Sequence, residues 1–152
     1  MSEVTKNLIA VGWREWMALP DLGIDHIKVK VDTGARTSAL HAFYIDPYVR
    51  QGKEWIRFGI HPLQRSKKKI IECKSPVKDR RIVTDSGGHK EYRYVIETSL
   101  SVGETIWSAE FTLTDRDTMK FRMLLGRTAL AERFIVDPSV SYLHGKPPKR
   151  KK

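Results

Sequence analysis

Alternation of apolar and polar residues recurs along this chain, and the period-two pattern predicts a structure built mainly from β-strands. In IKVKV (residues 27–31), Ile27, Val29 and Val31 alternate with two lysines, as expected for a strand with one covered face. Similar strand-like runs occupy residues 55–61, 69–73, 80–84, 90–100, 105–114, 121–125 and 134–143. We therefore expect a mainly β fold that closes or rolls into a barrel.

Helical patterns are confined to two short segments. The segment 126–134 places Ala129, Leu130 and Phe134 at helical spacing, which predicts one short helix near the C-terminus. The segment 36–43 is compatible with a helical turn or two.

One domain accounts for the whole pattern. The chain has 152 residues and a mass of 17.5 kDa, enough to bury a sizeable core, and 40% of its residues are hydrophobic. No repeat or shift of composition divides it, so we expect one domain over residues 1–143 and a basic, disordered tail over residues 144–152.

The N-terminal segment and the cysteine content predict the cellular location. The segment MSEVTKNLIAVGWREW has no long apolar run, so we expect neither a secretory signal nor a membrane span. Cys73 is the only cysteine, which excludes a disulfide framework within the chain. We therefore expect a cytoplasmic protein with no membrane partner.

Basic residues outnumber acidic residues by 28 to 18, for a formal net charge of +10. They gather in the loop QRSKKK (64–69) and in the C-terminal segment GKPPKRKK (145–152). Such clusters attract phosphate backbones, but solvated loops and tails account for most charge blocks, so a nucleic-acid partner is not favoured. The tryptophans that a stacking surface would need lie in strand-like contexts that core packing explains: Trp13, Trp16, Trp55 and Trp107.

The segment VDTGA places a carboxylate at the end of an apolar strand and turns sharply beside it, at Asp32, Thr33 and Gly34. An Asx turn that caps the strand is the simplest explanation, because Asp-x-Gly sequences often form one. A catalytic acid is the alternative. Two later motifs favour it: the glycine-rich hairpin DSGGH (85–89), and FRMLLGRTAL (121–130), in which an apolar strand leads to Gly-Arg and a helix.

The order of these motifs resembles the retropepsin plan over about residues 26–143: catalytic turn, hairpin flap, apolar strand with Gly-Arg, helix and final strand. With GWREW and LPDLGI, they make the chain similar to small bacterial retropepsin-like aspartic peptidases that carry the label ATP-dependent zinc protease. The resemblance covers nearly the whole chain except the tail. It implies an acid protease fold, a closed barrel with one short C-terminal helix, and hydrolysis of a peptide or protein substrate.

The resemblance also implies roles for individual residues. In the catalytic turn, Asp32 supplies the acid, the Thr33 hydroxyl bonds across a two-fold axis, and Gly34 lets the backbone approach closely. Two carboxylates in contact share a proton, so that one activates a water while the other donates to the substrate carbonyl. The chain has one such turn, so a homodimer must supply the second. The substrate-binding residues implied by this plan are Ala35, Arg36, Gly87, Gly88 and His89.

Gly126 and Arg127 are implied as structural support for the catalytic turn. Viral members of the fold commonly have an acid two residues after the turn glycine, where it pairs with the arginine of Gly-Arg, but this chain has Arg36 there. Either Arg127 has a new partner, or Arg36 lies in the cleft and selects an acidic substrate. An acidic substrate suits the family's association with ligases that add glutamates to a ribosomal protein, and such a glutamate ligase is a candidate partner. The acids that would keep the two arginines from repelling each other are Asp46, Glu97 and Asp137.

We expect neither a cofactor nor a metal, despite the family label. The sequence lacks a G-x-x-x-x-G-K-[ST] phosphate loop and an H-E-x-x-H zinc motif, and its five histidines are scattered. A metal site built from Cys73 with His41, His61 or His89 would require these residues to converge in the folded chain.

Two other functions stay open beside the homodimeric aspartic endopeptidase. The chain could keep the fold as a non-catalytic, peptide-binding adaptor, or act as a ribosome- or RNA-associated module through its basic clusters. In a retropepsin-like dimer the chain ends commonly interleave, which implicates KNLIAVGW (6–13) and FIVDPSVSYL (134–143) in the dimer interface.

Overall fold

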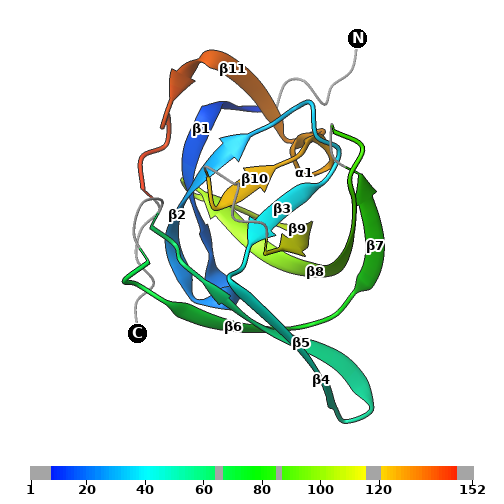
Figure 1. Cartoon of the computed structure of the whole chain (residues 1–152). Helices are drawn as coiled ribbons and strands as arrows, with labels where there is room; N and C mark the ends of the chain where they lie inside the picture. The colour runs from blue at the N-terminus through cyan, green and yellow to red at the C-terminus, as the bar shows by residue number, and fades with distance from the viewer. Residues whose placement is uncertain (1–7, 64–66, 85–86, 116–120, 147–152) are drawn as a thin grey trace.

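The computed structural model describes residues 8–63, 67–84, 87–115 and 121–146, which form β-strands almost throughout (Figure 1). The elements in chain order are β1 (Ile9–Leu19), the 3-10 turn η2 (Pro20–Leu22), β2 (Ile24–Val31), β3 (Ser38–His41), β4 (Tyr44–Arg50), β5 (Lys53–Ile60), β6 (Ile71–Pro76), β7 (Asp79–Thr84), β8 (Lys90–Val102), β9 (Thr105–Thr114), β10 (Met123–Leu125), α1 (Arg127–Leu130) and β11 (Phe134–Ser141). The mainly β class and the short C-terminal helix predicted from the sequence are confirmed.

The larger sheet curls into a ring. In the described chain its eight strands follow the order β11-β1-β2-β10-β3-β9-β8-β7, and an additional pairing of Ala18 in β1 with Ser101 in β8 joins strands that are distant in this order. Only one residue pair among the described residues makes this junction. The sheet is therefore ring-like, and less completely closed than the barrel expected from the sequence. A second, antiparallel sheet contains β4, β5 and β6, and the β4–β5 hairpin extends away from the ring (Figure 1).

The hydrophobic core lies on the inner face of the strands. The alternation in IKVKV is confirmed, because Ile27, Val29 and Val31 are buried whereas Lys30 is exposed. Each large apolar side chain buried in this way contributes about 1.5–3 kcal/mol to folding. The largest fully buried side chains are Phe58, Phe111, Met17, Leu19, Ile24, Ile27, Leu40, Ile56, Ile60, Ile96, Leu100 and Leu113.

The helical turn considered for residues 36–43 is wrong, because Ser38–His41 forms β3. This strand pairs in parallel with β9 and antiparallel with β10, and all four of its residues are buried. Backbone partners on both edges stabilise an extended chain here, so tertiary pairing overrides the weak local helical pattern. The predicted helix over 126–134 is also shorter than expected, since Phe134 already begins β11.

Strand β4 has no clear signal in the sequence, because Pro47 interrupts it and most of its side chains face solvent. It pairs only with β5, and proline is tolerated on such an edge strand. The longest α-helix among the described residues, α1, has four residues, and no described helix could cross a membrane.

The segment after β11 is held against β1. The backbone N–H of Tyr142 donates to the carbonyl of Arg14 at 3.0 Å, and His144 Nε2 lies 2.8 Å from the carbonyl oxygen of Ala10. Residues 144–146, which we expected to begin a disordered tail, therefore contact the sheet. The remaining tail residues, 147–152, lie outside the described residues.

Candidate active site

Asp32 opens a turn at the end of β2. Its backbone N–H donates to the carbonyl of Leu125 at 2.8 Å, which continues the parallel pairing of β2 with β10. The N–H of Gly34 donates to Asp32 Oδ1 at 3.0 Å, so the segment forms an Asx turn. The turn orients the carboxyl group and leaves Oδ2 without a protein partner in the described part of the chain. The simple structural role and the catalytic role are therefore compatible.

The outer face of this turn is open. Thr33 and Gly34 are exposed, and Asp32 and Ala35 are half-buried. A hydroxyl and a carboxylate that are both accessible at a strand end can meet the same groups of a second copy.

The segment that follows β10 holds the turn from behind. The N–H of Arg127 donates to the carbonyl of Ala35 at 2.8 Å, and the N–H of Thr128 donates to the carbonyl of Arg36 at 3.2 Å. The Thr128 hydroxyl donates to the same Arg36 carbonyl at 2.8 Å. These bonds join residues more than ninety positions apart, so the start of α1 fixes the shape of the catalytic turn.

A glycine is required at position 126 because the contact leaves no space for a side chain. A Cβ atom on Gly126 would lie 2.6 Å from both the carbonyl carbon and the carbonyl oxygen of Thr37, and 3.0 Å from the carbonyl oxygen of Ala35. The Gly126 N–H donates to the buried Ser38 Oγ at 3.0 Å. The structural-support role expected for Gly126 therefore has a direct geometric basis.

Arg127 supports the turn through a backbone group. Its Nη1 donates to the carbonyl of Gly34 at 3.2 Å, so its partner is none of the three acids considered from the sequence. Each of those acids has another partner: Asp46 pairs with Arg57, Glu97 with Lys78, and Asp137 with Ser139.

A cleft of about 1150 Å³ opens beside the turn. Its wall brings together Asp32, Gly34, Ala35 and Arg36 with side chains from β7, β8 and β9. The remaining lining residues were not predicted from the sequence: Thr37, Ala39, Arg81, Ile82, Val83, Thr84, Arg93, Glu110, Thr112, Leu124 and Thr128. Alternation in β9 did place Glu110 on a polar face, but no local signal paired that face with the turn.

Two of the three arginines in the cleft are neutralised by neighbouring acids. Arg81 Nη1 lies 2.9 Å from Glu110 and Arg81 Nε lies 2.8 Å from Asp79, whereas Arg93 Nη2 lies 3.3 Å from Glu91. Arg36 is exposed and has no carboxylate partner among the described residues. Arg36 is therefore the cation best placed to bind an anionic group in the cleft.

Glu110 is held between two cations. Lys78 Nζ lies 2.8 Å from one of its oxygens, and Arg81 Nη1 lies 2.9 Å from the other. The hydrogen bond from Lys78 and then that from Arg81 lower the pKa of Glu110 below its ordinary value. The carboxylate therefore stays charged and fixes both cations at the edge of the cleft.

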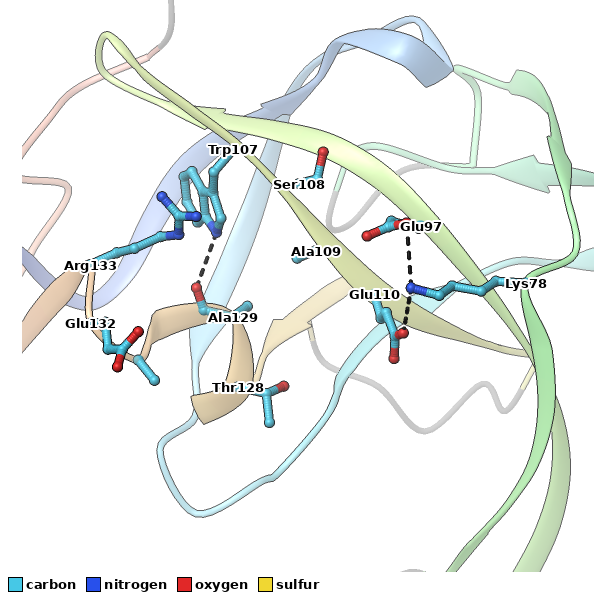
Figure 2. Close-up of a pocket in the computed structure, with 11 residues that line it drawn as sticks. Lys78, Glu97, Trp107, Ser108, Ala109, Glu110, Thr128, Ala129, Glu132 and Arg133 are labelled. Atoms are coloured by element: carbon cyan, nitrogen blue, oxygen red, sulfur yellow. Dashed lines mark hydrogen bonds and ion pairs between the residues drawn. The ribbon is translucent and has the colours of Figure 1, made fainter.

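A second cavity, of about 550 Å³, shares Glu110 and Thr128 with the cleft (Figure 2). Lys78 reaches between Glu97 and Glu110 on one side of this cavity, and the indole N–H of Trp107 donates to the carbonyl of Ala129 at 3.0 Å on another. The first contact lines the rim with charges, and the second ties α1 to β9.

The predicted glycine-rich hairpin is formed by β7 and β8. Its last pair is Thr84 with Lys90, and Gly88 has a φ of +85°, as a tight turn requires. The cleft is lined by the stem of this hairpin, whereas Gly87, Gly88 and His89 are exposed and are not among its lining residues. Within one chain, the described residues of the hairpin tip therefore lie outside the cleft lining, and Asp85 lies outside the described residues.

The residues present do not fit a zinc centre. No group of three or more His, Cys, Asp or Glu side chains comes close enough to hold a metal ion within residues 8–63, 67–84, 87–115 and 121–146. Cys73 is buried, and burial raises the pKa of its thiol to about 12, so the thiolate that binds metals is disfavoured. His61 stacks on Phe43, with ring centroids 4.1 Å apart.

Comparisons with known proteins support the retropepsin-like fold. Residues 10–147 match a family model described as RimB-like, retropepsin-like aspartic endopeptidase RimB. The crystal structure of a Legionella pneumophila protein of unknown function (DUF785) has a TM-score of 0.73 at 24% identity, covering 89% of this chain and 97% of that chain. That likeness shows the fold alone.

Similar curated proteins bear the name probable alpha-L-glutamate ligase rather than the zinc protease label expected from the sequence. The one from Shewanella pealeana is 46% identical over 142 residues, and the one from Parasynechococcus marenigrum is 49% identical over the same length. Both alignments cover 93% of this chain but only 31% and 30% of the relatives, so the chain spans less than a third of these proteins. By the match to its family model, the chain belongs to the RimB-like family of retropepsin-like aspartic endopeptidases.

Proposed function

We propose that this protein is an aspartic endopeptidase whose active form is a homodimer with the Asp32 residues of both copies at its catalytic centre. The observation that carries the proposal is the place of Asp32: a half-buried carboxyl group on an open turn, at the wall of a cleft of about 1150 Å³. Membership of the RimB-like family supports the same reaction class.

The chemistry needs both carboxyl groups. With one proton shared between them, the ionised Asp32 takes a proton from a water, whose oxygen bonds to the carbonyl carbon of the substrate. The protonated Asp32 of the other copy donates to the carbonyl oxygen, which gives a tetrahedral diol. The carbon–nitrogen bond then breaks as the leaving nitrogen receives a proton and the carbonyl re-forms.

The dimer would use the open face of the catalytic turn. Thr33 and Gly34 are exposed there, so a two-fold axis beside them brings the two turns together. The chain ends that we expected to interleave pair with each other within one chain, from Ile9 with Phe134 to Gly12 with Asp137. Strand β11 forms one edge of the described sheet, and its outer side can add a strand from the second copy.

We also propose that the cleft prefers substrates with glutamate or aspartate side chains. Arg36 offers a guanidinium without a carboxylate partner in the described chain, and its planar fork matches a carboxylate. The name of the relatives, alpha-L-glutamate ligase, suggests glutamate-bearing substrates and makes such a ligase a candidate partner.

The experiment that tests the reaction compares cleavage of a peptide library by the wild type and by Asp32→Asn. Asparagine keeps the oxygen that accepts the Gly34 N–H, so the turn and the dimer should persist while cleavage falls at least about 10³-fold. Wild-type activity should follow a bell across about pH 4 to 8, because it requires one shared proton. Asp25→Asn, a half-buried aspartate of β2 outside the cleft, is the matched control and should stay active.

Two results would contradict the mechanism: cleavage that survives in Asp32→Asn and stops on adding a chelator, or full activity in a monomer by sedimentation. Specificity is tested separately with Arg36→Gln. This variant should lose about tenfold in kcat/KM on peptides with glutamate near the scissile bond and little on alanine counterparts. Equal loss on both would show that Arg36 is structural.

A further inference from the structure

We propose that the outer face of β1 and β2, with the segment after β11, binds a single-stranded segment of RNA. We call this surface the terminal face. Its residues are Arg14, Trp16, Lys28, Lys30, Tyr142 and Lys146.

Strand alternation and register place these residues on one surface. The antiparallel pairing of β1 with β2 sets Arg14 opposite Lys30 and Trp16 opposite Lys28. The residue between the two on β1, Glu15, turns inward and is fully buried. The outer face of this pair therefore carries an aromatic ring among cations, contrary to the core position expected for Trp16.

Aromatic rings and cations are interleaved across the face. The Trp16 and Tyr142 ring centroids lie 6.1 Å apart, with an angle of 32° between the ring planes. Lys28 Nζ and Lys146 Nζ lie 5.2 and 4.8 Å from the Trp16 centroid, and Arg14 Cζ lies 5.1 Å from that of Tyr142. Bases stack on such rings while the phosphates on either side bind the cations.

Tyr142 has a backbone conformation that bulky residues rarely adopt. It has a φ of 55°, which is uncommon for a bulky residue and persists only where the surroundings enforce it. Its N–H donates to the Arg14 carbonyl, and the next two N–H groups, of Leu143 and His144, donate to Glu15. The buried carboxyl group thus holds the segment that presents the Tyr142 ring to solvent.

The charge of the face suits a polyanion. Within the described ranges, Lys28, Lys30 and Lys146 make no ion pair with a carboxylate, whereas Arg57 on the outer β4–β5 hairpin pairs with Asp46. An acidic peptide would satisfy the cations but would not use the two rings, so the combination favours a nucleic acid.

An RNA loop is the form of nucleic acid that this face fits. Bases are unpaired in RNA loops, where proteins stack aromatic and arginine side chains on them. Lys146 is exposed and rests over Trp16, so a base can take its place while its ammonium group moves to a phosphate. None of these residues lines the cleft, so the terminal face and the cleft are different surfaces of the chain.

The test measures binding of a fluorescein-labelled oligouridine of about twelve nucleotides to the full chain by anisotropy at several salt concentrations. The variant Lys28→Gln/Lys30→Gln/Lys146→Gln should bind about tenfold more weakly. The slope of log affinity against log salt should be smaller in magnitude by about 2, because each of the three lost phosphate contacts contributes about 0.7. The matched control, Lys53→Gln/Lys67→Gln/Lys74→Gln, removes the same charge elsewhere and should bind within about twofold of the wild type.

A second readout addresses stacking without disturbing the fold. Trp16→Phe should remove the quenching of tryptophan fluorescence that RNA causes in the wild type, and Asp32→Asn should bind RNA as the wild type does. Four results would overturn the proposal: equal loss in both lysine variants, quenching that persists in Trp16→Phe, displacement by duplex RNA or polyglutamate at equal concentration, or a lysine variant that loses its dimer.

Discussion

Two places in this molecule hold distant parts of the chain together, and they do so by different means. At the catalytic turn, the backbone N–H groups of Arg127 and Thr128 donate to the backbone carbonyls of Ala35 and Arg36. At the C-terminal segment, a buried side chain adds to the backbone bond from Tyr142 to Arg14. The Glu15 carboxyl group accepts the N–H groups of Gly12, Leu143 and His144, at 2.7, 3.1 and 3.4 Å.

The difference teaches where each region is sensitive to substitution. Backbone pairing leaves the Asp32 and Arg36 side chains free to face the cleft, whereas Gly126 behind the turn has no room for a Cβ. The C-terminal segment uses one buried acid as its acceptor, and removing that acid would leave one buried and two partly buried N–H groups without a partner, which is costly.

The largest effect expected is that of Glu15→Ala. It leaves three backbone N–H groups without their acceptor, and we expect it to lower the free energy of unfolding by about 3–5 kcal/mol. Glu15→Gln keeps one oxygen and should cost less. Urea denaturation measures both, and a loss below about 1 kcal/mol for Glu15→Ala would show that water replaces the carboxyl group.

Gly126→Ala tests the other region. The new Cβ would meet backbone atoms of Thr37 and Ala35, which cannot rotate away, so we expect a loss of about 2–3 kcal/mol and of peptide cleavage. Gly23→Ala is the control, because Gly23 has open space but a φ of +75°, and should cost about 1 kcal/mol. If the two variants are equally stable, crowding at Gly126 is not what shapes the turn.

Arg127→Gln separates the function of the catalytic turn from its stability. The side chain is exposed and makes one hydrogen bond to the Gly34 carbonyl, so the free energy of unfolding should change by less than about 1 kcal/mol. Cleavage should fall about tenfold, in kcat more than in KM, because the turn that carries Asp32 is less well fixed. Arg133→Gln, on the rim of the second cavity, should leave cleavage unchanged.

The smallest effect concerns Glu110. This acid forms ion pairs at the surface, whereas Glu15 is buried. The pKa of Glu110 is lowered on folding, so its stabilisation is present above the unfolded value near 4.5 and is lost as the pH falls through the folded value. Because the pair is partly solvated, we expect about 0.5 kcal/mol or less. Urea titrations should therefore separate wild type from Glu110→Gln at pH 7, and the difference should shrink as the pH is lowered below 4.5. A difference that does not change with pH would exclude the ion pairs as its cause.

Much of the fold could be predicted from the sequence because its signals are local. Alternation located β2, β5, β8 and β9, and the glycines marked the β7–β8 hairpin, because side-chain period and turn chemistry act over a few residues. The resemblance carried by VDTGA and LLGR also implied a supported turn at Asp32. Strand β3 and the exposed edge strand β4 were missed, because pairing with distant strands decided their conformation.

By itself, then, the sequence determined that a carboxylate ends a buried strand and that Gly126 follows an apolar one. The tertiary structure alone decided what these residues meet: the Gly34 carbonyl for Arg127, a cleft shared by Arg36, Arg81 and Glu110, and a half-buried position beside Tyr142 for Trp16. The physical reason is that strand register sets such contacts. Residues separated by tens of positions become neighbours only when backbone hydrogen bonds fix which strands lie side by side.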